Sequence, residues 1–286
     1  MRPYSIALLC LLAGLGSPAA AQQAQSTLAR IQATNTIRLG YLKEAVPFSF
    51  SESPGKASGY SVDICLKVAD GIKRQLNLAQ LDVKWVDVNT SNRFDRVSDG
   101  TIDLECGTST ITLARQKQVE FSLMIWADSG TFLVRPDAPV KQLSDLAGKK
   151  IAVIEGTTTE KALRDALGQH QVTAEVVLVK EHLDGLNAVA KRTADAYAGD
   201  QTVLVGLALA VEGQLKLVLS EGVFSFEPFG LVMRRNDADF KLAVNTVLAR
   251  LYRSAQIMDI YERWFGKIGK PAPGLLAVYM LNGVPE

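Results

Sequence analysis

The sequence has few of the side chains on which metal centres and nucleophilic catalysis depend. Its 286 residues include three cysteines and two histidines, His170 and His182. Cys10 lies in an N-terminal apolar run, which leaves Cys65 and Cys106, and no Cys/His cluster has the spacing of a zinc or iron site. Neither of these cysteines has an evident histidine partner in sequence, and no Gly-x-Ser-x-Gly motif occurs. We therefore expect no metal, no cofactor and no nucleophile.

An excess of charge of one sign is also absent. The formal net charge is +1, and it becomes 0 when Arg2 is removed with the N-terminal segment. Because charges of both signs are interspersed, the chain has no electrostatic footprint for nucleic acid or for an anionic membrane. The expected partner is a small molecule, or another protein that contacts local patches.

Long apolar runs are missing except near the N-terminus. Met1-Arg2 precedes an apolar run over residues 6–15, which Ser17-Pro18 breaks, and Ala19-Ala20-Ala21 supplies small residues for a signal peptidase. The run is too short to span a bilayer, so residues 1–21 are predicted to be a signal peptide cut near Ala21. We expect the mature chain to lie free in the periplasm. In that oxidising compartment the remaining two cysteines either form one disulfide or stay as buried thiols.

The hydrophobic pattern alternates between strands and helices in two successive blocks. This alternation predicts an α/β fold with largely parallel strands and a cleft between the blocks, whereas the segment after residue 265 is predicted to be a surface tail. Strands are predicted over residues 36–41, 81–88, 101–104, 150–154, 175–179, 194–198 and 227–233, and helices over 61–73, 90–97, 140–146, 161–167, 183–191, 201–210, 237–254 and 255–265.

Three polar features stand where predicted strands end. Thr108-Ser109-Thr110 is followed by Arg115, which could grip a carboxylate, although a capping threonine and a surface arginine explain the same residues. Gly156-Thr157-Thr158-Thr159-Glu160 could bind an anion at a helix N-terminus, and Thr157 with Glu160 could equally form a capping box. Asp200 could pair with an ammonium group, although a helix N-cap is the simpler interpretation.

The order and spacing of these motifs resemble the family-3 periplasmic solute-binding proteins over about residues 28–265. Among these, the sequence is most similar to the glutamate/aspartate-binding proteins of ABC importers. The motifs that carry the resemblance are Gly59-Tyr60-Ser61-Val62-Asp63, Asp103-Leu104-Glu105-Cys106-Gly107, Arg115-Gln116-Lys117-Gln118-Val119-Glu120-Phe121-Ser122, Asp145-Leu146-Ala147-Gly148-Lys149, Gly156-Thr157-Thr158-Thr159-Glu160 and Glu227-Pro228-Phe229-Gly230.

The resemblance implies a two-lobed periplasmic-binding-protein fold of type II. Each lobe would hold a central, mostly parallel sheet flanked by helices, and two crossing strands near residues 131–135 and 225–231 would join the lobes. Lobe 1 would comprise residues 26–131 plus 226–286, and lobe 2 residues 132–225. The lobes would close around an amino acid, and the protein, as a monomer, would deliver it to an ABC permease in the inner membrane.

The resemblance also implies roles for individual residues. Arg115 would hold the α-carboxylate with Thr110 and Thr158 as further donors, Asp200 would take the α-ammonium, and Thr108 would assist. His182 would lie near the ligand side chain.

The distal pocket departs from the pattern of the acidic-amino-acid binders. Leu42 occupies the position of one expected arginine, and Phe132 the position of another. Lys43 or Arg93 could replace the missing charge, so the ligand is glutamate, aspartate, glutamine, asparagine or a less polar amino acid. Two rival functions use the same scaffold: a periplasmic enzyme of the cyclohexadienyl dehydratase type, and a soluble receptor for a sensory kinase system.

Overall fold

The computed structural model describes residues 26–213 and 215–285. The predicted signal peptide, with Cys10, lies outside the described residues. The strands are β1 (Thr36–Tyr41), β2 (Glu44–Ala45), β3 (Ser49–Ser53), β4 (Lys56–Ser58), β5 (Asp82–Asp87), β6 (Leu104–Glu105), β7 (Glu120–Val134), β8 (Lys150–Ile154), β9 (Glu175–Val179), β10 (Ala196–Asp200), β11 (Val218–Leu219) and β12 (Ser225–Met233). The helices are α1 (Thr27–Thr34), α2 (Tyr60–Gln75), α3 (Arg93–Ser98), α4 (Thr158–Gln169), α5 (His182–Ala190), α6 (Gln201–Val211), α7 (Ala238–Arg253), α8 (Ile257–Phe265) and α9 (Pro273–Asn282), with 3-10 turns η1 (Arg115–Lys117) and η2 (Leu143–Leu146).

One nine-stranded sheet runs through the described part of the molecule, in the order β5-β1-β6-β12-β7-β10-β8-β9, with β11 paired to β7. At one end β5, β1 and β6 are parallel, and at the other end β10, β8 and β9 are parallel. Between these parallel ends, the long strands β12 and β7 pair antiparallel to each other and to their neighbours. The predicted α/β class with mostly parallel strands is therefore confirmed.

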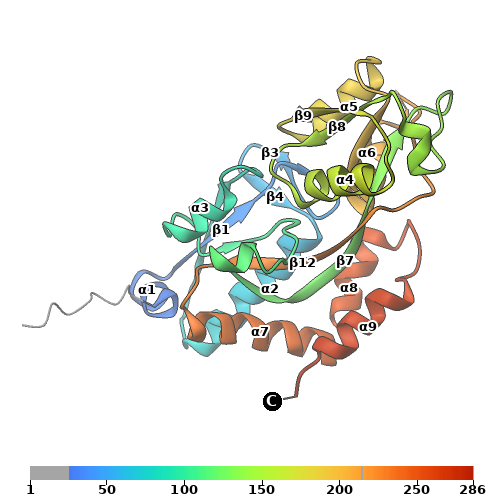
Figure 1. The fold of residues 1–286 in the computed structure, drawn as a ribbon. Helices are drawn as coiled ribbons and strands as arrows, with labels where there is room; N and C mark the ends of the chain where they lie inside the picture. Colours follow the sequence, from blue (N-terminus) through green and yellow to red (C-terminus); the bar gives the residue numbers. More distant parts are fainter. Residues whose placement is uncertain (1–25, 214, 286) are drawn as a thin grey trace, which may run out of the picture.

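The helices divide between the two ends of this sheet. Figure 1 shows α4, α5 and α6 gathered around β8 and β9, whereas α2, α7, α8 and α9 lie together beyond β7. Helices α2 and α7 approach closely because Gly71 has no side chain: a Cβ there would lie 2.2 Å from Val247 Cγ2. The chain thus forms two α/β regions that share the strands β7 and β12.

A disulfide joins Cys65 in α2 to Cys106, the residue after β6. Both cysteines are fully buried. Of the two interpretations that the sequence left open, the structure therefore has the disulfide. The bond ties a helix to the strand end that precedes Thr108, the first of the predicted site residues.

The C-terminal segment is not the surface tail that the sequence predicted. Helix α9 begins with Pro273 in its first turn, where a missing N–H breaks no helical hydrogen bond. Its Tyr279 hydroxyl lies 2.7 Å from the Tyr60 hydroxyl, which donates to the Ile125 carbonyl of β7. Its proline and glycine residues led to the prediction of a tail. The helix is stabilised by packing against β7 and α7, which the local sequence does not reveal.

We expect Leu275→Ala to lower the free energy of unfolding by about 2 kcal/mol, because it deletes a side chain that is only 5% exposed in the main hydrophobic core. The matched control is Leu276→Ala in the same helix turn, where the side chain is 39% exposed. Its effect should stay within about 0.5 kcal/mol. Equal effects in urea denaturation would contradict the packing of α9.

Candidate functional site

The segment after β6 brings two of the predicted residues together. Thr108 and Thr110 are both buried, and the Ser61 hydroxyl of α2 donates to the Gly107 carbonyl at the start of this segment. Arg115, in η1, donates from its guanidinium to the Thr110 carbonyl at 2.9 Å. The alternative of a capping threonine and a surface arginine does not hold. Thr108 and Thr110 are buried and cap no helix, and Arg115 is half-buried against this segment.

A second arginine stands beside the first. The guanidinium carbons of Arg93 and Arg115 lie 5.1 and 5.2 Å from the centroid of the Phe94 ring. Arg93 is only 4% exposed, and its Nε has no hydrogen-bond partner among the described residues. Burial, followed by the charge of Arg93, lowers the pKa of Arg115 to about 10, so Arg115 stays charged at neutral pH. Within the described structure neither guanidinium has a carboxylate within ion-pair distance, which leaves two cations available for an anionic ligand.

Glu105, in the motif that precedes this segment, interacts electrostatically with both arginines. It is fully buried, and its Oε2 accepts a hydrogen bond from the Ser109 hydroxyl at 2.8 Å. Its other oxygen has no hydrogen-bond partner in the part of the chain that the structure describes. Burial raises the pKa of Glu105, whereas the charge of Arg93 opposes that shift.

The glycine-threonine turn caps α4, as one of its two interpretations predicted, while anion binding by the turn stays a prediction. Thr157 is the N-cap of α4, with its hydroxyl accepting from the Glu160 amide, while the Glu160 carboxylate accepts from the Gly156 amide. Thr158 instead directs its hydroxyl toward β12 and the segment after β6, 2.7 Å from Glu227 Oε2 and 3.2 Å from the Thr110 hydroxyl. Thr158 in the turn after β8 and Thr110 in the segment after β6 therefore meet at Glu227.

Glu227 is the residue at that meeting point, and sequence reasoning assigned it no role. It lies on β12 and is 1% exposed. Its Oε2 accepts from the hydroxyls of Thr110 and Thr158, and its Oε1 from that of Ser225, each at 2.7 Å. The sequence did contain a signal, because Glu227 opens one of the motifs that carried the family resemblance.

The Asp200 side chain is not the helix cap that the simpler interpretation predicted. It occupies the N-cap position of α6, but its side chain makes no capping hydrogen bond. Its Oδ1 instead lies 3.3 Å from the Thr159 hydroxyl. The α6 amide of Thr202 donates to Asp128 on β7, so the cap comes from another strand and Asp200 remains available for a ligand.

The remaining predicted positions lie around this centre. His182 begins α5, and its Nδ1 lies 2.8 Å from the Tyr197 hydroxyl. Leu42 is buried, and a Cβ at Gly107 would meet its Cδ1 at 2.8 Å. Lys43 pairs with Asp87 on the surface, which leaves Arg93 as the better candidate for the additional cation.

We expect His182 to remain neutral down to about pH 4, because burial, followed by the charge of Arg93, lowers its pKa from 6.5 to about 4. A depressed histidine pKa favours the neutral ring in the folded state, so stability should be lost as the pH falls from 6.5 towards 4. An NMR titration of the imidazole measures the midpoint directly. In His182→Gln, that part of the pH-dependent loss of stability should vanish, and its persistence would contradict the assignment.

The family of bacterial extracellular solute-binding proteins, family 3, matches residues 37–267. The chain belongs to this family. The L-glutamate/L-aspartate-binding protein of Pseudomonas aeruginosa is 33% identical over 264 residues, which cover 92% of this chain and 87% of that protein. A glutamate/aspartate import solute-binding protein of Escherichia coli is 29% identical over 262 residues, covering 91% and 87%.

Solved structures share the fold of this chain. The solute receptor for L-cysteine of Neisseria gonorrhoeae superposes with a TM-score of 0.74 at 20% identity, covering 86% of this chain and 98% of that one. An ancestral amino-acid-binding protein, described as a precursor of cyclohexadienyl dehydratase, gives a TM-score of 0.72 at 26% identity, covering 84% and 99%. The two sequence relatives named above are both binding proteins.

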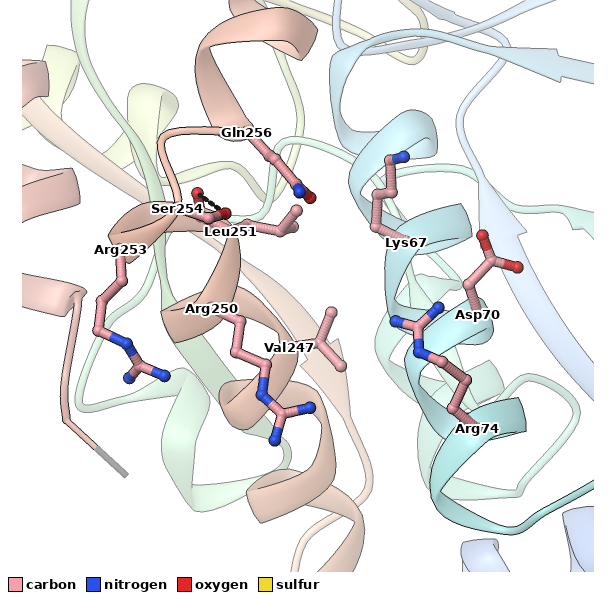
Figure 2. A pocket seen from close by; sticks show the side chains of 9 residues that line it. All are labelled: Lys67, Asp70, Arg74, Val247, Arg250, Leu251, Arg253, Ser254 and Gln256. Atoms are coloured by element: carbon pink, nitrogen blue, oxygen red, sulfur yellow. Dashed lines mark hydrogen bonds between the residues drawn. The ribbon is translucent and has the colours of Figure 1, made fainter.

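A cavity of about 560 Å³ lies elsewhere on this solute-binding protein, between α2 and the α7–α8 region. Figure 2 shows Lys67, Asp70 and Arg74 on one wall, facing α7 residues that include Val247 and Arg250. These charges belong to exposed faces of helices and include none of the predicted site residues. The cavity therefore serves as a control surface for tests of the cleft.

The described residues contain neither a candidate metal site nor a candidate membrane span. No group of three or more histidine, cysteine or acidic side chains there could hold a metal ion. No helix in the same part of the chain has the length and apolar character that a membrane crossing requires.

Proposed function

We propose that this solute-binding protein captures an acidic amino acid between its two regions and delivers it to an ABC permease. The observation that carries the proposal is the opposition of charges. Arg93 and Arg115, which have no ion-pair partner among the described residues, stand on one side, and Asp200, which accepts one long hydrogen bond within the same part of the chain, stands on the other. An amino acid with a side-chain carboxylate carries the matching groups, two anionic and one cationic.

The hydroxyl groups refine the predicted roles. Because a threonine hydroxyl has one proton, those of Thr110 and Thr158 that approach Glu227 leave lone pairs for the ligand. We therefore assign both oxygens to the α-ammonium, together with Asp200. Arg115 holds the α-carboxylate, with the backbone N–H groups of the segment from Thr108 and of the α4 N-terminus as additional donors.

Arg93 is the residue that we assign to the side-chain carboxylate of the ligand. It is buried, it is charged, and it interacts electrostatically with Asp200 and His182 in the cleft. Leu42, packed behind Gly107, supplies an apolar wall in place of a second arginine. The pocket for the ligand side chain thus has one arginine, Arg93, rather than two. This favours a ligand whose side-chain carboxylate needs a single bidentate partner.

We expect Arg93→Gln to weaken glutamate and aspartate binding about 10- to 100-fold, because it replaces a charge-assisted hydrogen bond with a neutral one. Glutamine binding should change by less than about threefold, since the amide carries no charge to lose. Competition titrations of both ligands measure this ratio. An equal loss for glutamate and glutamine would place Arg93 away from the ligand side chain.

The lobe boundaries and the closure mechanism remain part of this proposal. We take residues 26–131 plus 226–286 as lobe 1 and 132–225 as lobe 2, with β7 and β12 as the connecting strands. Thr158 of lobe 2 contacts Thr110 of lobe 1, and the Leu183 amide donates to Glu44 across the same opening. Ligand contacts from both lobes favour the closed state because only that state makes all of them. The chain would act in the periplasm as a monomer after cleavage near Ala21.

A binding role rather than an enzymatic one is favoured by the same residues. A dehydratase needs an acid aimed at a leaving hydroxyl, whereas the oxygens of Asp200, Thr110 and Thr158 form an acceptor set once an ammonium group is bound. The resemblance to a precursor of cyclohexadienyl dehydratase makes the comparison worth measuring. Prephenate and arogenate should show no turnover above background.

Calorimetric titration of refolded, ligand-stripped protein with the twenty amino acids and several dicarboxylates tests the proposal. Saturable, tight binding of glutamate or aspartate is expected, with glutamine and asparagine weaker. Binding of neutral amino acids alone would overturn the role of Arg93, and binding of none would overturn the function.

A further inference from the structure

The face of the sheet at the crossing strands carries three carboxyl groups. In the register of β7 and β12, Asp128 is directly opposite Glu227, and Gly130 is opposite Ser225. On the other side of β7, Asp200 is opposite Gly130. Opposed residues share a face, and residues two apart on a strand share it too, so Asp128, Glu227 and Asp200 project to the same side. Figure 1 shows β7 and β12 running together between the two regions.

Asp128 and Glu227 are buried, and Asp200 is partly buried on the same face. Three carboxylates so placed repel each other, and their hydrogen bonds decide which one keeps a proton. Glu227 accepts three hydroxyl donors. Asp128, 6% exposed, accepts from the backbone amides of Ser129 and Thr202. Within the described residues, the one hydrogen bond that the Asp200 side chain accepts is the 3.3 Å contact with the Thr159 hydroxyl. The first two are stabilised as anions by several donors, whereas Asp200 is not.

We infer that Asp128 is a positioning residue for the ammonium site: it caps α6 in place of Asp200 and keeps Asp200 protonated until the ligand's ammonium group displaces that proton into solvent. The inference rests on the proposed function. In the displacement the O–H bond of Asp200 breaks, the proton leaves for the buffer, and the carboxylate accepts hydrogen bonds from the ammonium group, which keeps its own protons. Binding is therefore linked to the release of about one proton.

The surrounding groups agree with this assignment. Burial, then the charges of Asp128 and Glu227, raise the pKa of Asp200 well above its usual value, while Thr159 and Arg93 act in the opposite direction. Burial raises the pKa of Asp128 to about 6, so it is mostly ionised at pH 7.

The other titratable groups around Asp200 do not change charge near neutral pH. The pKa of His182 is lowered to about 4, that of Arg115 to about 10, and that of Tyr197 is raised well above 10. Burial raises the pKa of the buried Glu105, whereas Arg93, Ser109 and Arg115 oppose that shift, and Asp128 is not one of its causes.

The test is calorimetric titration with glutamate at pH 7 in phosphate and in Tris, whose ionisation enthalpies differ. The slope of observed heat against ionisation enthalpy counts the protons released. For the wild type we expect about one proton, and a Kd that falls about tenfold for each unit of rise between pH 6 and pH 7. In Asp128→Asn the count should drop below about 0.5 and the pH profile should flatten, because removing the neighbouring charge lets Asp200 ionise before the ligand arrives.

Glu105→Gln is the matched control, and its proton count should equal that of the wild type whatever its affinity. Heats of wild-type binding that are independent of the buffer would overturn the inference while leaving the proposed function intact. An unchanged count in Asp128→Asn, or a count lost in Glu105→Gln, would also overturn it. If the wild type binds no amino acid, the proposed function fails and the inference with it. The wild-type comparison of buffers needs no variant, so it stands even if Asp128→Asn does not fold.

Discussion

Arg115→Ala should weaken amino-acid binding by about 100-fold or more, because it removes the partner of a desolvated carboxylate, at a cost of about 3 kcal/mol or more. Arg115 donates to the Thr110 carbonyl and lies over Phe94, so the guanidinium is held in place before the ligand arrives. Since its side chain is half-buried rather than part of a hydrophobic cluster, the fold should persist. Titration calorimetry and circular dichroism measure the two effects.

Two variants make that result specific. Arg115→Lys keeps the charge but lacks the planar fork, so its loss should be smaller than that of alanine and still larger than tenfold. Arg74→Ala removes an arginine from the cavity between α2 and α7 and should leave binding unchanged. Wild-type affinity in Arg115→Ala, or an equal loss in Arg74→Ala, would contradict the assignment of Arg115.

Replacing both Cys65 and Cys106 by alanine should lower the free energy of unfolding by about 4 kcal/mol, because the bond closes a loop with a sequence separation of 41 residues and its loss frees the unfolded chain. For a protein of this size, the melting temperature should fall by about 10 °C.

The control for this variant is the wild-type protein, unfolded, reduced and refolded with the thiols kept reduced. It should melt within about 3 °C of the alanine variant, because both lack the same constraint. A melting temperature close to that of the oxidised protein in both samples would mean that the disulfide contributes little to stability.

How far the sequence predicted the site depended on the kind of residue. Residues at strand ends, such as Thr110, Thr158 and Asp200, could be located because a strand-turn-helix pattern exposes them locally. Glu227 and Asp128 could not be assigned a role, because each lies inside a long strand and gains its partners from segments far away in sequence. Helix α9 was missed for a related reason, since its stability comes from contacts with β7 and α7 rather than from its own residues.

The sequence by itself determined the α/β class and, through its ordered motifs, the family, because both follow from local hydrophobic periods and from residues close together in the chain. Only the tertiary structure decided that the two cysteines are bonded, that Arg93 stands beside Arg115, and that Asp128 rather than Asp200 caps α6. These facts depend on strand register and on which side chains are desolvated together. Pairing across β7, β10 and β12 joins residues about 60 to 110 positions apart, and no local pattern specifies it.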